Sequence, residues 1–194
     1  MKYTVVDGHC DTPMELWLRQ ENLRSNTCQV SLERAKKLSG YVQFYAFCTV
    51  WLEQDGSFEA HYAAALEHFN RQLDENKDQI VRCKNEADAR AAIGSGKCGA
   101  FLSIEGAEAI SCDPGKLELA CAQGVRMIAP AWNAQNALTG SCMTGGGLTA
   151  QGKEFVRRAQ KLGMILDVSH ISEKAFWDLC DITEKPFVAS HSNS

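Results

Sequence analysis

The sequence lacks the features that mark membrane-bound, nucleic-acid-binding and secreted proteins. No apolar run approaches the roughly 18 residues that a membrane-spanning helix requires, so we expect no membrane association. Basic residues gather only in short pairs such as Lys36-Lys37, and the net charge is -4, which argues against a nucleic-acid partner. The N-terminus lacks the apolar stretch and the small-residue cleavage site of a signal peptide.

The nine cysteines include no Cys-x-x-Cys pair. Their number is odd and their spacing is irregular, which disfavours both a disulfide framework and a structural zinc site. Free thiols that pack as small apolar groups are the better interpretation. We therefore predict a cytoplasmic protein.

What the sequence does contain is a series of short apolar runs. Each is rich in β-branched or aromatic residues and is bounded by Gly, Pro or polar residues, as buried parallel strands are. At 194 residues the chain can bury one core, so we expect a single domain over residues 1–194. The predicted strands cover 3–6, 41–50, 100–104, 127–131, 165–168 and 187–189.

Helical periodicity fills the segments between these runs. Apolar residues recur at spacings of three and four, and the expected cap residues stand at several ends. The predicted helices cover 58–76, 86–93, 114–122 with Asp113 as its cap, and 149–162 before Gly163, and another begins at Ser172. Strands and helices that alternate in this way predict a parallel α/β fold, either an open sheet or a barrel.

Polar residues at the ends of the predicted strands favour the barrel. His9 and Asp11 follow the first strand, Glu105 the third, His170 the fifth and His191 the sixth. In a barrel the carboxyl ends of the strands converge on one mouth, which is where such folds keep their active sites. These five residues therefore predict one shared metal site.

The two carboxylates differ in how strongly they point to a metal. In extended backbone residues i and i+2 point to the same side, so His9 and Asp11 can bind one ion, although such a pair alone is more often a hydrogen-bonded loop pair. Glu105 ends an apolar strand, where a carboxylate is costly to bury without a cation. It can offer one oxygen to each of two metals, and we predict it as the bridging, catalytic carboxylate. A capping or salt-bridged Glu105, with Glu108 as the competing ligand, is the alternative.

The two histidines each end a predicted strand as part of a Ser-His pair. His170 and His191 lie one strand-helix unit apart, which places them at neighbouring positions on a barrel rim. A single histidine is more often an ordinary core or surface residue. We interpret His61 and His68 in that way, because they lie on a helix with no carboxylate at ligand spacing.

Ligands of this kind predict hydrolysis of an amide or ester bond. Two divalent ions about 3.5–4 Å apart bridge a hydroxide and polarise a carbonyl. Imidazole and carboxylate ligands together suit zinc, and manganese, cobalt or iron are alternatives. No Gly-x-Ser-x-Gly motif for a serine nucleophile occurs, and Cys10, between two predicted ligands, is interpreted as a packing thiol.

Taken together, these residues resemble the renal or membrane dipeptidase family, the M19 peptidases of the amidohydrolase superfamily. The most specific stretch is GLTxxG at 147–152 followed by LGMILDVSH at 162–170. The other similar motifs are VVDGHCD at 5–11, SIEG at 103–106 and ASHSN at 189–193.

The resemblance implies a TIM-like (β/α)8 barrel, of which these residues supply about the first six strands. It implies one metal on His9, Asp11 and Glu105, and a second on Glu105, His170 and His191. It also implies a metallo-dipeptidase that cleaves small dipeptides, often with a D-residue on the C-terminal side. Members of the family often form dimers, so a homodimer is a further expectation.

Two departures from the family pattern affect the substrate site. Some members place a substrate-contacting histidine after the fourth strand, where this chain has Trp132 and Asn133, which become the candidate substrate contacts. The family's substrate-carboxylate arginine and proton-transferring aspartate are expected beyond Ser194. Six strand signals stand where eight are expected, so we expect a barrel domain that is truncated at its C-terminus. A different small-amide or lactone hydrolase, a catalytically silent metal-binding fragment and a metal-free α/β domain remain the alternatives.

Overall fold

The structure, a computed structural model, describes residues 3–48 and 57–192. Thr49 and Val50, at the end of the predicted strand 41–50, lie outside the described residues, as does Asn193 of the ASHSN motif. The chain forms two compact units. The first contains Met1–Phe47 and Tyr62–Ser103, and the second contains Cys48–His61 and Ile104–Ser194.

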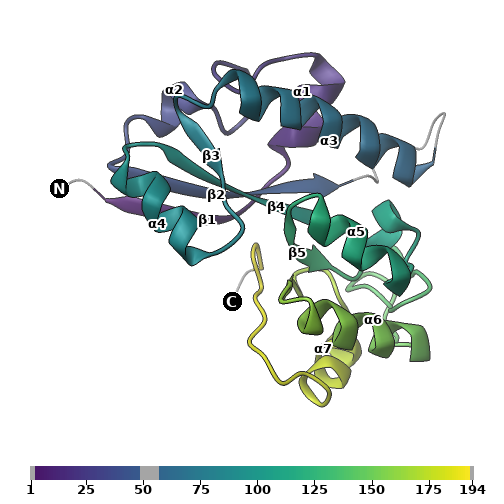
Figure 1. Ribbon diagram of the computed structural model, residues 1–194. Coiled ribbons are helices and arrows are strands. Elements are labelled where there is room, and N and C mark those ends of the chain that lie inside the picture. Colours follow the sequence, from purple (N-terminus) through teal and green to yellow (C-terminus); the bar gives the residue numbers. More distant parts are fainter. Residues whose placement is uncertain (1–2, 49–56, 193–194) are drawn as a thin grey trace. The chain divides into compact units, whose positions relative to one another are not determined.

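The first unit is built on parallel strands (Figure 1). Strand β1 (Thr4–Cys10) pairs with β2 (Gly40–Cys48), and β4 follows β2 in the sheet. The short strand β3 (Ile80–Arg82) pairs in parallel with the start of β4 (Cys98–Glu105). Strands β2 and β4 are almost continuously buried, as the unbroken apolar runs in their sequences predict.

Helices of the first unit begin where the sequence supplies a cap. The Ser31 side chain accepts a hydrogen bond from the Arg34 amide at the start of α2, and Asn85 accepts one from the Asp88 amide at the start of α4. Helix α3 buries Tyr62, Ala65, Leu66, Phe69 and Leu73, the face that its periodicity predicts. The helices are α1 (Thr12–Arg19), α2 (Leu32–Ala35), α3 (Phe58–Glu75), whose first turn belongs to the second unit, and α4 (Glu86–Gly94).

The second unit contains the last residue of β4, Glu105, and two further parallel strands. Strand β5 (Val125–Ala129) pairs with the short β6 (Ile165–Leu166). Its α-helices are α5 (Leu117–Ala122), α6 (Ala150–Lys161) and α7 (Glu173–Cys180), and the 3-10 turns are η1 (Ala107–Ile110) and η2 (Pro114–Lys116). Side chains of Asp113, Thr149 and Ser172 cap η2, α6 and α7.

A long loop joins β5 to α6 and packs closely against itself. It forms one antiparallel bridge within itself, between Thr139 and Leu148, and a second from Ser141 to Ile171, in the segment between β6 and α7. At Gly152, in the first turn of α6, a Cβ atom would lie 2.0 Å from the carbonyl oxygen of Leu138. Only glycine allows this approach of helix and loop backbone.

Most predicted elements are confirmed, with four differences. The predicted strand 187–189 is wrong, because Val188 alone forms an isolated parallel bridge, to Asp167. The predicted helix 114–122 divides into η2 and α5, since Pro114 opens a 3-10 turn capped by Asp113. Strand β3 is too short to stand out as an apolar run. Helices α1 and α2 and the turn η1 were not predicted, and only one residue, Asp11, separates α1 from β1.

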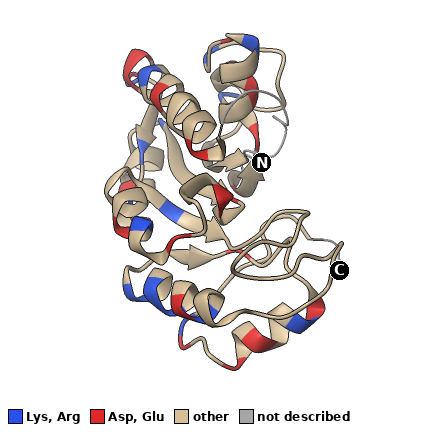
Figure 2. Ribbon diagram, turned by 90° about the vertical axis from the view of Figure 1, so that its right-hand side faces the viewer, with Lys and Arg blue, Asp and Glu red and all other residues tan. Residues whose placement is uncertain are grey.

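Charged side chains lie mainly on the helices, where Figure 2 shows acidic and basic residues interspersed. Several form ion pairs four residues apart on exposed helix faces, an arrangement that contributes only a few tenths of a kcal/mol each. The helical ion pairs are Glu15–Arg19, Glu67–Arg71, Glu86–Arg90 and Lys174–Asp178.

Within residues 3–48 and 57–192 we find no helix with the length and apolar character needed to cross a membrane.

Phe69 provides a test of the packing in the first unit. It is fully buried, with its ring centroid 4.8 Å from that of Tyr45 and 6.0 Å from that of Phe47. We expect Phe69→Ala to lower the free energy of unfolding by about 3–5 kcal/mol, because it leaves a cavity among aromatic rings. Urea denaturation measures this loss. Phe58→Ala on the same helix, at a residue 38% exposed, is the control, and a similar loss in both variants would contradict the assignment.

Candidate metal centre

His9 and Asp11 lie together at the carboxyl end of β1. Nε2 of His9 is 3.3 Å from Oδ1 of Asp11. The pairing of β1 with β2 shifts register between Asp7 and Cys10, and the His9 amide donates to Oδ1 of Asp7 over 3.0 Å. An irregularity of this kind turns side chains at the end of a strand, here just before the two predicted ligands.

The Asp11 carboxylate is placed to cap α1 but does not do so. Asp11 is the N-cap residue of that helix, yet its side chain accepts no capping hydrogen bond. Its Oδ1 atom is buried and makes no hydrogen bond. A buried carboxylate oxygen that accepts no hydrogen bond is unfavourable, and a protonated His9, whose Nε2 lies 3.3 Å away, or a bound cation would remove that cost.

Cys10 stands between these two residues and is buried. Burial raises the pKa of its thiol to about 12, so the group is protonated at neutral pH. A thiol is a poor nucleophile in that state, because the thiolate is the reactive form. The interpretation of Cys10 as a packing residue agrees with this environment.

Three predicted ligands meet within the second unit. Oε1 of Glu105 lies 2.7 Å from Nε2 of His170 and 3.1 Å from Nε2 of His191. The two Nε2 atoms are 2.7 Å apart. Glu105 is 4% exposed, so its carboxylate meets the two imidazoles largely out of water.

The hydrogen bonds of the other ring nitrogens fix which atoms these imidazoles present. Nδ1 of His170 faces Oδ1 of Asn133 at 3.1 Å, and an amide oxygen can only accept, so Nδ1 carries the proton. Nδ1 of His191 faces the hydroxyl of Ser190 at 2.8 Å, and that hydroxyl donates its own proton to Asp167. In their neutral form, both imidazoles therefore turn an Nε2 lone pair toward Glu105.

Two lone pairs and a carboxylate oxygen within about 3 Å of one another repel unless a cation lies among them. Nitrogen and oxygen donors of this kind are the usual ligands of zinc and similar divalent ions. The donor set of Glu105, His170 and His191 therefore fits a metal, as does the unsatisfied Asp11 oxygen in the first unit.

Glu108, the competing carboxylate, has a hydrogen-bond partner of its own in Asn136. Its Oε1 accepts a hydrogen bond from Nδ2 of Asn136 at 3.0 Å, and Asn136 also donates to the Pro130 carbonyl oxygen. The two helical histidines, His61 and His68, lie on α3. Both are buried, and Nε2 of His68 lies 3.2 Å from the Glu21 carbonyl oxygen.

The two candidate substrate contacts, Trp132 and Asn133, follow β5 and are half-buried. The Trp132 ring centroid lies 6.1 Å from that of His170. Asn133 is hydrogen bonded to His170, a contact that sequence reasoning missed, because the two residues are 37 positions apart.

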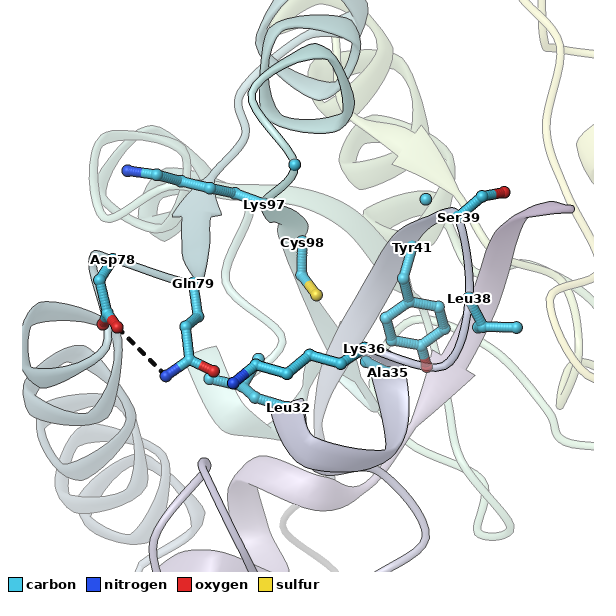
Figure 3. A pocket seen from close by; sticks show the side chains of 12 residues that line it. Leu32, Ala35, Lys36, Leu38, Ser39, Tyr41, Asp78, Gln79, Lys97 and Cys98 are labelled. Atoms are coloured by element: carbon cyan, nitrogen blue, oxygen red, sulfur yellow. Dashed lines mark hydrogen bonds between the residues drawn. The ribbon is translucent and has the colours of Figure 1, made fainter. Parts of the chain in front are cut away.

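A separate cavity of about 280 Å3 opens in the first unit, at the opposite end of the strands (Figure 3). It adjoins Gly40 and Cys98, the first residues of β2 and β4, whereas His9 lies near the carboxyl end of β1. Burial raises the pKa of the Cys98 thiol. None of the five predicted metal ligands lines this cavity.

The sequence profile of the membrane dipeptidase family (peptidase family M19) matches residues 1–194. The chain belongs to this family. Membership in a family of metallopeptidases implies that divalent metal is bound, in agreement with the donor sets of both units.

Curated relatives match over part of their length. An uncharacterized protein from the PQQ-III 3' region of Acinetobacter calcoaceticus is 37% identical over 131 residues, which are 63% of this chain and 42% of the relative. The dipeptidase tcpJ of Claviceps purpurea is 29% identical over 152 residues, 73% of this chain and 36% of the relative. The matched part thus spans less than half of each of these two relatives.

Solved structures confirm the predicted α/β fold of the TIM-barrel type. A dipeptidase described as an M19 metallopeptidase has a TM-score of 0.86 and 27% identity, covering 100% of this chain and 64% of that one. A metallopeptidase from Rhodobacter sphaeroides, liganded with a phosphinate mimic of the dipeptide L-Ala-D-Ala, has a TM-score of 0.84 and 25% identity, covering 100% and 66%.

Thiol labelling tests the environment of Cys10. We expect iodoacetamide at pH 8 to modify the exposed Cys142 readily and to leave Cys10 unmodified, because burial keeps the Cys10 thiol protonated and covered. Mass spectrometry of the digested protein measures both sites. Both cysteines should react once the protein is unfolded in urea, and equal labelling of the two in the folded protein would contradict the prediction.

Proposed function

We propose that the protein is a metal-dependent dipeptidase that hydrolyses the amide bond of small dipeptides. The observation that carries the proposal is the meeting of Oε1 of Glu105 with Nε2 of His170 and of His191, in a chain of the M19 family. A carboxylate and two imidazoles that meet in this way suit a divalent cation as their occupant.

We propose two ions, shared by five ligands. His9 and Asp11 would hold one, His170 and His191 the other, and Glu105 would give an oxygen to each. The uncapped Asp11 carboxylate supports the first pair, and the fixed tautomers of the two histidines support the second. Zinc is the proposed metal, because mixed imidazole and carboxylate ligands suit it.

Divalent ions bound there supply Lewis acidity for the scissile carbonyl and for the attacking water. The protein's own contribution is to keep the ligands in place. Glu105 stays buried at the end of β4, and Asn133 holds the ring of His170 from behind. Trp132, beside His170, would form an apolar wall of the substrate site.

Dipeptides with a D-residue on the C-terminal side are among the proposed substrates. The similar Rhodobacter sphaeroides metallopeptidase was solved with a phosphinate mimic of L-Ala-D-Ala, which supports that choice. We also propose that both units belong to one barrel domain, and that it works in the reducing cytoplasm, since all nine cysteines carry free thiols. A homodimer stays a prediction.

Hydrolysis of a panel of L,L and L,D dipeptides tests the activity. We expect cleavage that a chelator abolishes and that added zinc, manganese or cobalt restores. His170→Ala should lose the activity, whereas His61→Gln, on a helical histidine with no predicted ligand role, should keep it. Failure to cleave any dipeptide in a chelator-sensitive way would rule the proposal out.

The shared role of Glu105 predicts a change in metal content. In Glu105→Gln the neutral amide cannot serve two ions, so we expect the bound metal to fall from about two ions per chain to one or fewer, with loss of hydrolysis. Metal analysis after gel filtration measures the stoichiometry. Glu108→Gln, three residues further on, is the matched control and should keep the wild-type content.

A further inference from the structure

Asp167 is a buried carboxylate to which the proposed hydrolysis assigns no role. It directly follows β6 and is 2% exposed. Its backbone amide donates to the Ile128 carbonyl oxygen on β5. Within the described residues every partner of its side chain is a neutral donor, so no cation offsets the burial of this charge.

All of those donors come from two serines. Oδ1 of Asp167 accepts from the amide of Ser169 at 3.1 Å, from the hydroxyl of Ser169 at 2.6 Å and from the amide of Ser190 at 3.1 Å. Oδ2 accepts from the Ser190 hydroxyl. One carboxylate thus joins the two chain segments that carry His170 and His191.

The two serines link Asp167 to His191 by hydrogen bonds. A carboxylate can only accept, so both hydroxyl protons point to Asp167 and the lone pairs of both serine oxygens stay available. The Ser190 oxygen then accepts from Nδ1 of His191 at 2.8 Å, and the Ser169 oxygen accepts from the His191 amide at 3.2 Å. The charge on Asp167 therefore selects the tautomer of His191 in which Nδ1 carries the proton and Nε2 does not.

We propose that Asp167 is a positioning residue of the metal centre, which acts through Ser190 to hold His191 in its metal-binding tautomer and through Ser169 to hold the His191 backbone. This inference rests on the proposed function, because it assigns His191 as a ligand. Partners behind a metal-bound histidine fix its ring and tautomer in this way. His170 has a partner of its own in Asn133, so the effect of Asp167 on tautomer is specific to His191.

The variant Asp167→Asn separates this role from simple packing. It keeps the shape and the Oδ1 acceptor but places an NH2 group against the Ser190 hydroxyl. That hydroxyl must then accept from residue 167 and donate to Nδ1 of His191, which moves the imidazole proton to Nε2. A protonated Nε2 cannot bind a metal.

Two measurements on the purified protein test the proposal. In metal-free protein, 15N chemical shifts of the histidine rings should report the Nδ1-H tautomer of His191 in the wild type and the Nε2-H tautomer in Asp167→Asn. In chelator competition, zinc should bind the variant about 10–100-fold more weakly than the wild type. An unchanged tautomer together with unchanged zinc affinity would overturn the proposal.

Asp178 offers a matched control. Its carboxylate also accepts from a backbone amide, that of Leu148, and hydrogen bonds with the Leu148 amide and Lys174 lower its pKa. Asp178→Asn should leave both the His191 tautomer and the zinc affinity unchanged. A loss of affinity equal to that of Asp167→Asn would mean that any weakening of this unit suffices, and would count against a specific role.

The serine variants keep the proposal testable if Asp167→Asn does not fold. Ser190→Ala should weaken zinc binding, and Ser190→Thr, which keeps the hydroxyl, should restore it. Equal affinity in these two variants would contradict the relay. A wild-type protein that binds no metal would refute the proposed function, whereas the tautomer measurement on metal-free protein would still decide the role of Asp167.

Discussion

The close approach of one carboxylate and two imidazoles is the constraint on which the candidate site of the second unit depends. Oε1 of Glu105 and the Nε2 atoms of His170 and His191 approach within 3.1 Å of one another, and the carboxylate is buried. Such an arrangement persists only when the surrounding structure holds each group from behind. The short parallel pairing of β5 with β6 and the bridge beyond it supply that support.

The ligand residues could be predicted because their positions follow from a simple rule. Polar residues at the carboxyl ends of parallel strands are candidate site residues, and Glu105 is the last residue of β4 and His9 the last but one of β1. Strong periodicity likewise predicted α3 and α6 almost to the residue, since both bury one apolar face and carry caps or a terminating glycine.

Elements with weak local signals could not be predicted. The three residues of β3 become a strand only because they pair with the start of β4. The segment 187–189 has strand-like residues, but within it Val188 alone forms a bridge, to Asp167. Of its two neighbours, Phe187 is half-buried and Ala189 is exposed. In both cases, pairing with a residue far away in the sequence decides whether the segment is a strand, and the local sequence gives no information about that pairing.

The same reason explains why the supporting residues of the site were missed. Asn133 reaches His170 across 37 positions, and Asp167 reaches the Ser190 amide across 23. An asparagine in a loop or an aspartate at the end of a strand has many ordinary uses. Their roles follow from hydrogen-bond direction, which only the three-dimensional arrangement gives.

Gly152 shows how the site constrains sequence change far from the metal ligands. Alanine would favour the helical state by about 1 kcal/mol at an ordinary helix position. Here a Cβ atom would meet the Leu138 carbonyl oxygen at 2.0 Å. The same loop contains Cys142, whose amide donates to the His170 carbonyl oxygen. Evolution toward a more stable α6 at this residue is therefore blocked unless the whole loop is rebuilt at the same time.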